Sequence, residues 1–206
     1  MTRDDPSLRF EKELWKSGIR FVAGLDEAGR GALAGPVAVG AIILPIDSNL
    51  SLTLSGVRDS KQMTPLERES AAPRIKDIAL AWGVGFASSA EIDSDGIVCA
   101  TRLAALRALK ALSLTPSYLL TDFRLELPQL DIPQTALVKG DALCLSIAAA
   151  SVLAKTTRDE LMRGLDSVHP GYGLGKHKGY GTQAHRLALK RLGYSPIHRR
   201  TFSIKP

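Results

Sequence analysis

The sequence has few cysteines and lacks any long, uninterrupted apolar segment. Its only cysteines are Cys99 and Cys144, and neither has a partner cysteine or a histidine at the spacing of a metal site. Two isolated thiols argue against a disulfide-rich secreted fold and are typical of a reducing compartment. No apolar run approaches the roughly 20 residues that cross a bilayer. The first 15 residues are charged rather than apolar, so we expect no signal peptide, no membrane association and a cytoplasmic location.

Acidic residues are scarce in the last quarter of the chain. Residues 154–206 contain 11 Lys and Arg against 3 Asp and Glu, whereas residues 1–153 contain 16 against 18. The net charge of +6 therefore combines a C-terminal segment of +8 with a body of −2. This asymmetry predicts a polyanionic partner, although a basic face kept only for solubility is an open alternative. The length of 206 residues and the hydrophobic content of 45% suit one folded domain with a small appendage.

The order of the predicted elements indicates an α/β fold with a mixed sheet flanked by helices. Thr64 and Glu67 form a capping box around Pro65, and Pro73 is expected to kink or split the helix that they begin. The expected strands cover 20–26, 36–44, 81–88, 117–121 and 134–138. The expected helices cover 7–17, 64–80, 97–112, 142–160 and 183–192.

Acidic side chains occur where the chain leaves apolar elements. Asp26 and Glu27 end the first expected strand, Asp122 ends the fourth, and Asp141 precedes the buried helix. If the first and fourth strands are neighbours, these carboxylates converge at one edge of the sheet. Converging carboxylates repel each other unless a cation neutralises them, and Mg²⁺ or Mn²⁺ prefers such oxygen ligands. Two such ions form the usual centre for phosphodiester hydrolysis.

Each of these acids also has a purely structural interpretation. Asp141 could be a helix N-cap, and Asp122 could open a turn. The pair at the end of the first strand could be solvated, and strand alternation would point its members to opposite faces unless the strand ends or bulges there. Asp93 and Asp95 flank an expected helix start and are interpreted as caps.

Six blocks of the sequence, in order, resemble those of prokaryotic ribonuclease HII. The first is Asp26-Glu27-Ala28-Gly29-Arg30-Gly31 within GLDEAGRGALAGPV. Single glycine-rich strings are weak signals, but six ordered blocks that cover nearly the whole chain are highly specific. The other five are Arg58-Asp59-Ser60-Lys61, Tyr118-Leu119-Leu120-Thr121-Asp122, residues 139–159, His177-Lys178-Gly179-Tyr180-Gly181-Thr182 and His198-Arg199-Arg200-Thr201-Phe202.

The resemblance implies an RNase H-like catalytic domain over residues 1–165 and a small, basic, helical C-terminal region over residues 166–206. It also implies a monomer that binds two divalent metal ions, Mg²⁺ or Mn²⁺. The implied metal ligands and catalytic residues are Asp26, Glu27, Asp122 and Asp141. The implied substrate-binding residues are Gly29, Arg30, Gly31, Lys61 and Tyr180.

The activity that the resemblance implies is hydrolysis of RNA in RNA–DNA hybrids and at single ribonucleotides within duplex DNA. Cleavage would fall on the 5′ side of the ribonucleotide and leave a 3′-hydroxyl and a 5′-phosphate. The glycines of the loop at 29–31 would let backbone amides approach the sugar, whose 2′-hydroxyl distinguishes RNA from DNA. The tyrosine at 180 would stack on the sugar 3′ of the ribonucleotide.

The sequence departs from the family pattern at two positions. Phe123 stands where the family usually has glycine, directly after the third acid, and Gln62 replaces a lysine, which puts a second lysine contact in doubt. The alternative from another functional class is a non-catalytic nucleic-acid-binding module in which Phe123 spoils the metal site. A dinucleotide-binding loop is disfavoured because GRGALAG lacks the GxGxxG spacing.

Two relatives with related chemistry or fold fit the sequence less well. Ribonuclease HIII usually carries an extra N-terminal domain, whereas only about 20 residues precede the first expected strand here. Ribonuclease HI lacks the DEAGRG start and the C-terminal block. The C-terminal residues 202–206 are too short to predict binding to a sliding clamp.

Overall fold

A computed structural model describes residues 5–123 and 125–203 of the chain. Its centre is a five-stranded sheet in the order β3-β2-β1-β4-β5. The pairs β1–β2 and β2–β3 are antiparallel, and the pairs β1–β4 and β4–β5 are parallel, which confirms the predicted mixed sheet. The strands are β1 (Val22–Ala28), β2 (Val37–Ile43), β3 (Ala81–Ala87), β4 (Tyr118–Asp122) and β5 (Gln134–Leu137).

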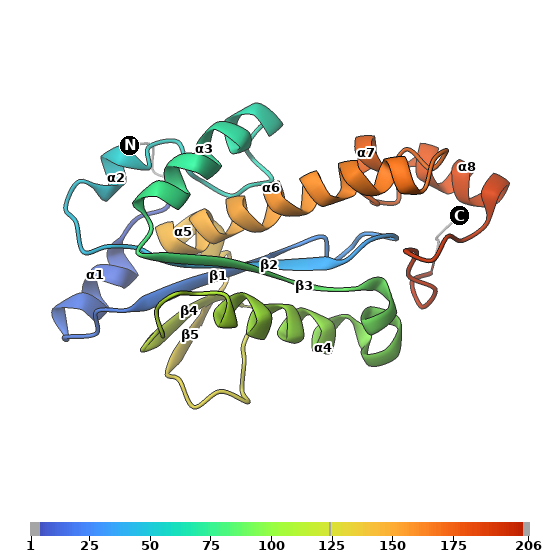
Figure 1. Cartoon of the computed structure of the whole chain (residues 1–206). Coiled ribbons are helices and arrows are strands. Elements are labelled where there is room, and N and C mark those ends of the chain that lie inside the picture. Colours follow the sequence, from blue (N-terminus) through green and yellow to red (C-terminus); the bar gives the residue numbers. More distant parts are fainter. Residues whose placement is uncertain (1–4, 124, 204–206) are drawn as a thin grey trace.

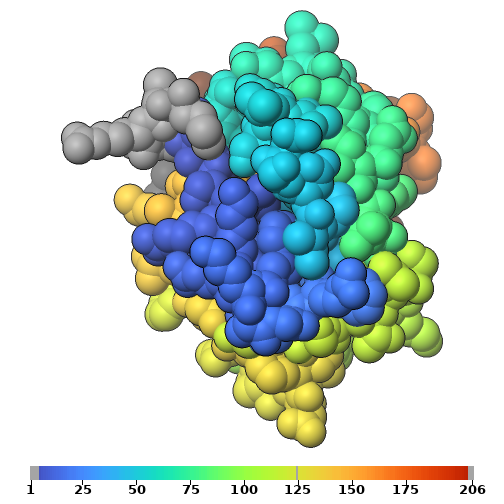
Figure 2. All heavy atoms as spheres, turned by 90° about the vertical axis from the view of Figure 1, so that its left-hand side faces the viewer, coloured from blue at the N-terminus to red at the C-terminus, as the bar shows by residue number. Residues whose placement is uncertain are grey.

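Helices cover both faces of this sheet (Figure 1). The face with α3 (Pro65–Ile78) and α6 (Leu145–Val168) buries one apolar cluster, and α4 (Ser89–Lys110) buries another on the opposite face. The shorter helices are α1 (Arg9–Lys16), α2 (Leu50–Thr53), α5 (Gly140–Leu143), α7 (Leu174–His177) and α8 (Gln183–Leu192). Figure 2 shows the blue residues of the α1 region packed beside the cyan segment around α2.

Small residues allow α6 to lie directly on the sheet. A Cβ atom at Gly24 of β1 would collide with the backbone of Ser146, and one at Gly40 of β2 would collide with the carbonyl of Ala150. The alanine-rich half of α6 is almost fully buried, as its sequence predicts. This close contact brings α6 beside the end of β1, where the first two acids lie.

The structure corrects several predicted boundaries. Helix α4 begins at Ser89, after a capping box formed by Ser88 and Glu91, rather than at residue 97. Gly96 interrupts it with a φ of 79°, so the predicted start corresponds to the second half of a kinked helix. Asp93 is therefore not a cap: its carboxylate accepts hydrogen bonds from the backbone N–H groups of Arg200 and Thr201.

Two long helices also differ from expectation: α3 lacks the expected break, and α6 runs farther than expected. Helix α3 begins with the predicted capping box at Thr64 and remains one helix through Pro73. Helix α6 ends at Val168, so the predicted division between residues 165 and 166 falls inside it and stays a prediction. Within the described residues, no helix is long and apolar enough to cross a membrane. Of the C-terminal segment at 202–206, residues 204–206 lie outside the described part.

Candidate active site

Three carboxylates meet where β1 and β4 end their pairing. Ligand oxygens of Asp26, Glu27 and Asp122 all lie within 4.8 Å of one another. The prediction that the strand ends before Glu27 is wrong, because β1 continues to Ala28. Its pairing with β4 stops at Leu25, however, which leaves the flank of β1 open beside Asp122. The carboxylate of Asp122 also accepts a hydrogen bond from the backbone N–H of Gly140, at 3.0 Å.

The electrostatics of this cluster fit a divalent cation. Burial, reinforced by the neighbouring Glu27 carboxylate, raises the pKa of Asp26 well above its usual value. Burial also raises the pKa of Glu27, although Arg30 opposes the rise. Among the described residues, Asp26 Oδ2 and Glu27 Oε2 are buried without a hydrogen-bond partner. Buried, unpaired carboxylate oxygens within reach of one another are what a hard cation would bind.

Asp141 lies at the edge of this cluster rather than inside the three-carboxylate group. It is buried in the first turn of α5, with an Oδ2 atom 3.7 Å from Lys61 Nζ. Burial and the nearby carboxylate of Asp59 raise the pKa of Asp141. Partial burial alone would lower the pKa of Lys61, but the surrounding carboxylates raise it. An open cleft of about 480 Å³ contains these groups and is lined in part by Glu27, Asp59, Lys61, Asp122 and Asp141.

The glycine-rich loop after β1 is held by two buried arginines. Arg199 donates hydrogen bonds to the carbonyl oxygens of Gly29 (2.8 Å), Arg30 (2.8 Å) and Gly35 (2.9 and 3.0 Å). The guanidinium of Arg158 packs against Gly29, where φ is +84° and a Cβ atom would collide with it. Arg158 also donates to Ala34 and other carbonyls around the loop. No described atom lies within 4 Å of the position of a Cβ on Gly31, so this part of the loop stays open to a ligand.

Tyr180 lies beside a pocket of about 270 Å³ between α3, α6 and α7. Its ring is half-buried, with Lys155 Nζ at 5.4 Å and Arg158 Cζ at 5.6 Å from the ring centroid. We call this space the basic pocket because five of its lining residues are cationic and two are acidic. The cationic residues are Arg68, Lys155, Arg163, Lys176 and Lys178, and the acidic residues are Glu69 and Asp159.

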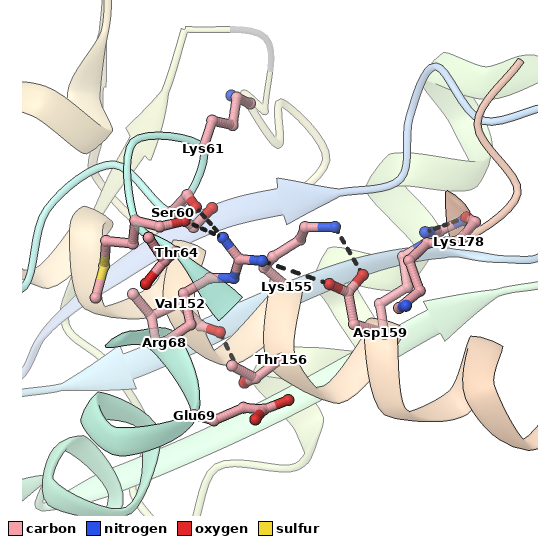
Figure 3. A network of polar contacts seen from close by, with 12 residues as sticks. Ser60, Lys61, Thr64, Arg68, Glu69, Val152, Lys155, Thr156, Asp159 and Lys178 are labelled. Carbon is pink, nitrogen blue, oxygen red and sulfur yellow. Dashed lines mark hydrogen bonds and ion pairs between the residues drawn. The ribbon is translucent and has the colours of Figure 1, made fainter. Parts of the chain in front are cut away.

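Asp159 joins two of these cations from different helices (Figure 3). Lys155, one turn away on α6, contacts one carboxylate oxygen at 2.7 Å, and Arg68 of α3 contacts the other at 3.7 Å. Burial lowers the pKa values of Lys155 and Lys178, although the Asp159 carboxylate opposes both shifts. One carboxylate shared by two cations leaves the pocket with excess positive charge.

The structure adds residues that the sequence did not single out as site residues. Asp59 faces the cleft, and its signal was its place two residues before Lys61 in a recognised block. Arg158 and Arg199 also lie in recognised blocks, yet their sequence neighbours do not reveal that they bind a loop more than 120 residues away. Arg199 is 1% exposed, so it is tied into the fold and is not available to a phosphate.

Comparison with known proteins identifies the family of this chain. The family model of ribonuclease HII matches residues 23–205. The chain is 55% identical over 198 residues to ribonuclease HII of Synechococcus sp. (strain JA-3-3Ab), covering 96% of this chain and 88% of that protein. It is 51% identical over 201 residues to ribonuclease HII of Desulfitobacterium hafniense (strain Y51), covering 98% and 75%.

Solved structures show the same fold. The ribonuclease H2 of Pyrococcus horikoshii OT3 superimposes with a TM-score of 0.72 at 28% identity, covering 89% of this chain and 94% of that one. A chain of the PCNA:RNase HII complex from Archaeoglobus fulgidus gives a TM-score of 0.75 at 26% identity, covering 90% and 96%. The RNase H-like fold and the acidic cluster are thus found together in this chain, which belongs to the ribonuclease HII family of endonucleases.

Proposed function

We propose that this enzyme cleaves RNA–DNA hybrids and duplex DNA containing single ribonucleotides, on the 5′ side of the ribonucleotide. The observation that carries the proposal is that two features adjoin. They are the carboxylate cluster of Asp26, Glu27 and Asp122, and the loop anchored by Arg199. The cluster suits phosphodiester hydrolysis, and the loop presents backbone groups to a sugar. Breaking the bond between phosphorus and O3′ leaves a 3′-hydroxyl and a 5′-phosphate.

The four acids would hold two divalent ions, Mg²⁺ or Mn²⁺. Asp26, Glu27 and Asp122 provide the central ligands, and Asp141 lies at the edge of the same cleft. When bound, such ions supply charge neutralisation at the phosphate, activation of water and stabilisation of the leaving oxygen. The ammonium group of Lys61, beside Asp141 and largely exposed, is placed to attract the substrate phosphate.

Other residues would select and orient the nucleic acid. Gly29, Arg30 and Gly31 would contact the 2′-hydroxyl and backbone of the ribonucleotide. Tyr180 would pack on the deoxyribose on the 3′ side, while the basic pocket beside it attracts backbone phosphates. This arrangement needs one chain only, so we propose a monomer.

The second candidate is a binding module without catalysis, in which Phe123 blocks the metal site. The position of Phe123 argues against it: the side chain is 61% exposed, and the three central carboxylates still converge. The exposed ring is therefore not wedged between the ligands.

A duplex with one embedded ribonucleotide separates these two functions. The proposed enzyme nicks this duplex in Mg²⁺ or Mn²⁺ and loses activity in EDTA. Its cleavage rate should fall by several orders of magnitude when Asp122→Asn removes a central ligand. Circular dichroism should show that the variant remains folded. Metal-independent nicking, or full activity of the variant, would disprove the assigned site. Tight binding by the wild type without any nicking would favour the binding module.

A further inference from the structure

An apolar wall occurs inside the otherwise charged catalytic cleft. Phe123 and Val138 both line the cleft, and they are 61% and 63% exposed. The other lining residues are mostly charged or polar, and they include Glu27, Asp122 and Asp141. Exposed apolar side chains that adjoin one another are a common mark of a binding surface. We call Phe123 and Val138 the apolar wall.

The backbone of the apolar wall is fixed relative to the metal ligands. The N–H of Phe123 donates to the carbonyl of Leu137 at 2.9 Å, which extends the β4–β5 ladder by one residue. Phe123 directly follows Asp122, whose carboxylate accepts from Gly140. A substrate bound at the acids must therefore pass the wall at a set distance from the scissile phosphate.

The wall and Tyr180 lie on opposite sides of the acids along α6. The wall adjoins Asp141 of α5, which leads directly into the N-terminal end of α6. Tyr180 contacts Lys155 and Arg158, at least ten residues or about 15 Å farther along this helix. Ser151, whose side chain opposes the rise in the pKa of Asp26, lies between the two ends.

We propose that the apolar wall packs against the sugar of the nucleotide immediately 5′ of the cleaved bond and favours deoxyribose at that position. This inference rests on the proposed function, because the 5′ direction follows from placing Tyr180 on the 3′ side. Phe123 is the specificity-determining residue. The 5′ nucleotide is deoxyribose in DNA with one ribonucleotide, but ribose within continuous RNA.

The physical basis is the unfavourable burial of a hydroxyl group. A deoxyribose offers a methylene at C2′ to the ring of Phe123, whereas a ribose offers a hydroxyl that loses water without gaining a partner there. Because the cleft is open and the hydroxyl can keep part of its hydration, we expect discrimination of about five- to tenfold. A larger factor would need a fully enclosed contact.

The experiment varies one atom of the substrate and one side chain of the enzyme. Two duplexes carry the cleavable ribonucleotide after a nucleotide with either 2′-H or 2′-OH, and a denaturing gel separates cleavage at the chosen bond by product length. Wild type should show a higher kcat/KM for 2′-H. Phe123→Gly and Phe123→Ser should reduce the ratio of the two kcat/KM values about five- to tenfold, so that little preference remains. Phe123→Leu, which remains apolar, should largely keep the preference.

Controls separate a local contact from a general effect. Leu52→Ala changes an apolar side chain of α2 that is 77% exposed and should leave the preference unchanged. A 2′-OH on the nucleotide 3′ of the ribonucleotide should affect wild type and Phe123→Gly by the same factor. If wild type cleaves but folded Phe123→Gly and Phe123→Ser keep the full 2′-H preference, this inference is overturned while the proposed function stands. Absence of cleavage by wild type would overturn both.

Discussion

At the scale of single residues, Tyr180 is held by its backbone and leaves part of its ring accessible. Its N–H donates to the carbonyl of His177 at 2.9 Å, and its own carbonyl accepts from His185 Nδ1 at 3.0 Å. The ring adjoins Lys155 and Arg158. Because both backbone contacts are independent of the ring, the side chain can be changed without releasing the loop.

Tyr180→Ala should therefore lose substrate selection rather than folding. We expect cleavage of single embedded ribonucleotides to fall about five- to tenfold, with a smaller loss on long RNA–DNA hybrids, because aromatic stacking on nucleic acid contributes roughly 1–3 kcal/mol and a sugar contact lies at the low end. Tyr180→Phe, which keeps the ring, is the matched control. Measuring kcat/KM on both substrates under one metal condition tests this. Equal losses on both would assign Tyr180 to structure or general binding.

The four acids proposed to be catalytic could be named from the sequence, but their mutual geometry could not. Chain position and the family blocks both selected Asp26, Glu27, Asp122 and Asp141. Strand alternation argued against joint action of the first two, and only the open flank of β1 beyond Leu25 shows how they meet Asp122. Asp59 could not be predicted as a site residue in the same way, because it does not follow a strand. The other acids were predicted from their position where the chain leaves an apolar element.

At the scale of elements, periodicity and caps predicted most helices and strands, and errors arose where tertiary contacts override them. The proline of α3 gave a misleading signal, and the apolar spacing in α4 revealed only its second half. Gly96 breaks the helical dihedrals without ending α4, and Pro73 lies inside a continuous α3. Pairing with β2 extends β1 to Ala28, which the local sequence does not reveal.

The loop between β1 and β2 depends on a residue from the far end of the chain. Arg199 donates to three carbonyl groups of this loop, and burial together with the nearby Arg158 lowers its pKa to about 9. A lysine has one nitrogen and cannot reach all three oxygens in the same planar arrangement. The loop should therefore lose its shape when the guanidinium is removed, even if the positive charge remains.

Arg199→Lys should lower both stability and ribonucleotide recognition. We expect a loss of about 2–3 kcal/mol in the free energy of unfolding, because at least one buried carbonyl loses its donor. Cleavage should fall at least tenfold with the metal requirement unchanged. Arg200→Ala is the matched control at the next position. The side chain of Arg200 is exposed, and its backbone N–H, which the substitution keeps, binds Asp93. Urea denaturation and kcat/KM measure the two effects, and a Lys variant as stable and active as wild type would contradict the loop-anchoring role.

At the scale of the whole molecule, the positive charge of the C-terminal quarter is divided between buried and exposed residues. Arg158 and Arg199 are buried in the fold, whereas Lys190 and Arg191 are exposed on α8. Only exposed cations can release counterions from a nucleic acid backbone on binding. The net charge of the segment therefore overstates its number of phosphate contacts.

Replacing both Lys190 and Arg191 by glutamine should reduce the salt dependence of duplex binding. Each lost phosphate contact lowers the slope of log K against log salt by about 0.9, so we expect a reduction of about 1–2. Lys12→Gln with Lys16→Gln changes two exposed cations on α1, at the other end of the chain, and should leave the slope unchanged. Fluorescence anisotropy at several salt concentrations measures both pairs. An unaltered slope in the α8 variant would make these residues solvated surface.

A chain of neutral histidines connects the C-terminal region to the Tyr180 loop. Because a carbonyl can only accept, His185 donates from Nδ1 to Tyr180, and its Nε2 accepts from His198 Nε2 at 3.0 Å. His198 Nδ1 then accepts from the backbone N–H and the hydroxyl of Ser195, at 3.0 and 2.7 Å. One tautomer of each ring satisfies every contact, and a proton added to either ring breaks the chain.

This chain should make folding stability depend on pH in a specific window. Burial, and then the neighbouring His185, lower the pKa of His198 to about 4, below the value of about 6.5 in an unfolded chain. At pH 7.5 and above both states are almost entirely neutral, and the contribution to stability is nearly complete. As the pH falls from 6.5 towards 4, the unfolded chain binds a proton that the folded protein excludes, so stability falls by up to about 1.4 kcal/mol per pH unit.

Between pH 7.5 and 5.0 the free energy of unfolding should therefore drop by about 2 kcal/mol from this site. His198→Gln removes the titrating ring, so it should be less stable at pH 7.5 yet show a shallower decline over the same window. Urea denaturation at pH 7.5, 6.5, 5.7 and 5.0 gives both curves, and stopping at pH 5.0 avoids most of the range in which ordinary carboxylates titrate. The absolute loss at pH 7.5 would follow from any damage to the core, whereas only removal of a depressed pKa changes the slope. Parallel curves for the two proteins would mean that His198 is not excluded from protonation in the folded state, and the neutral histidine chain would have to be abandoned.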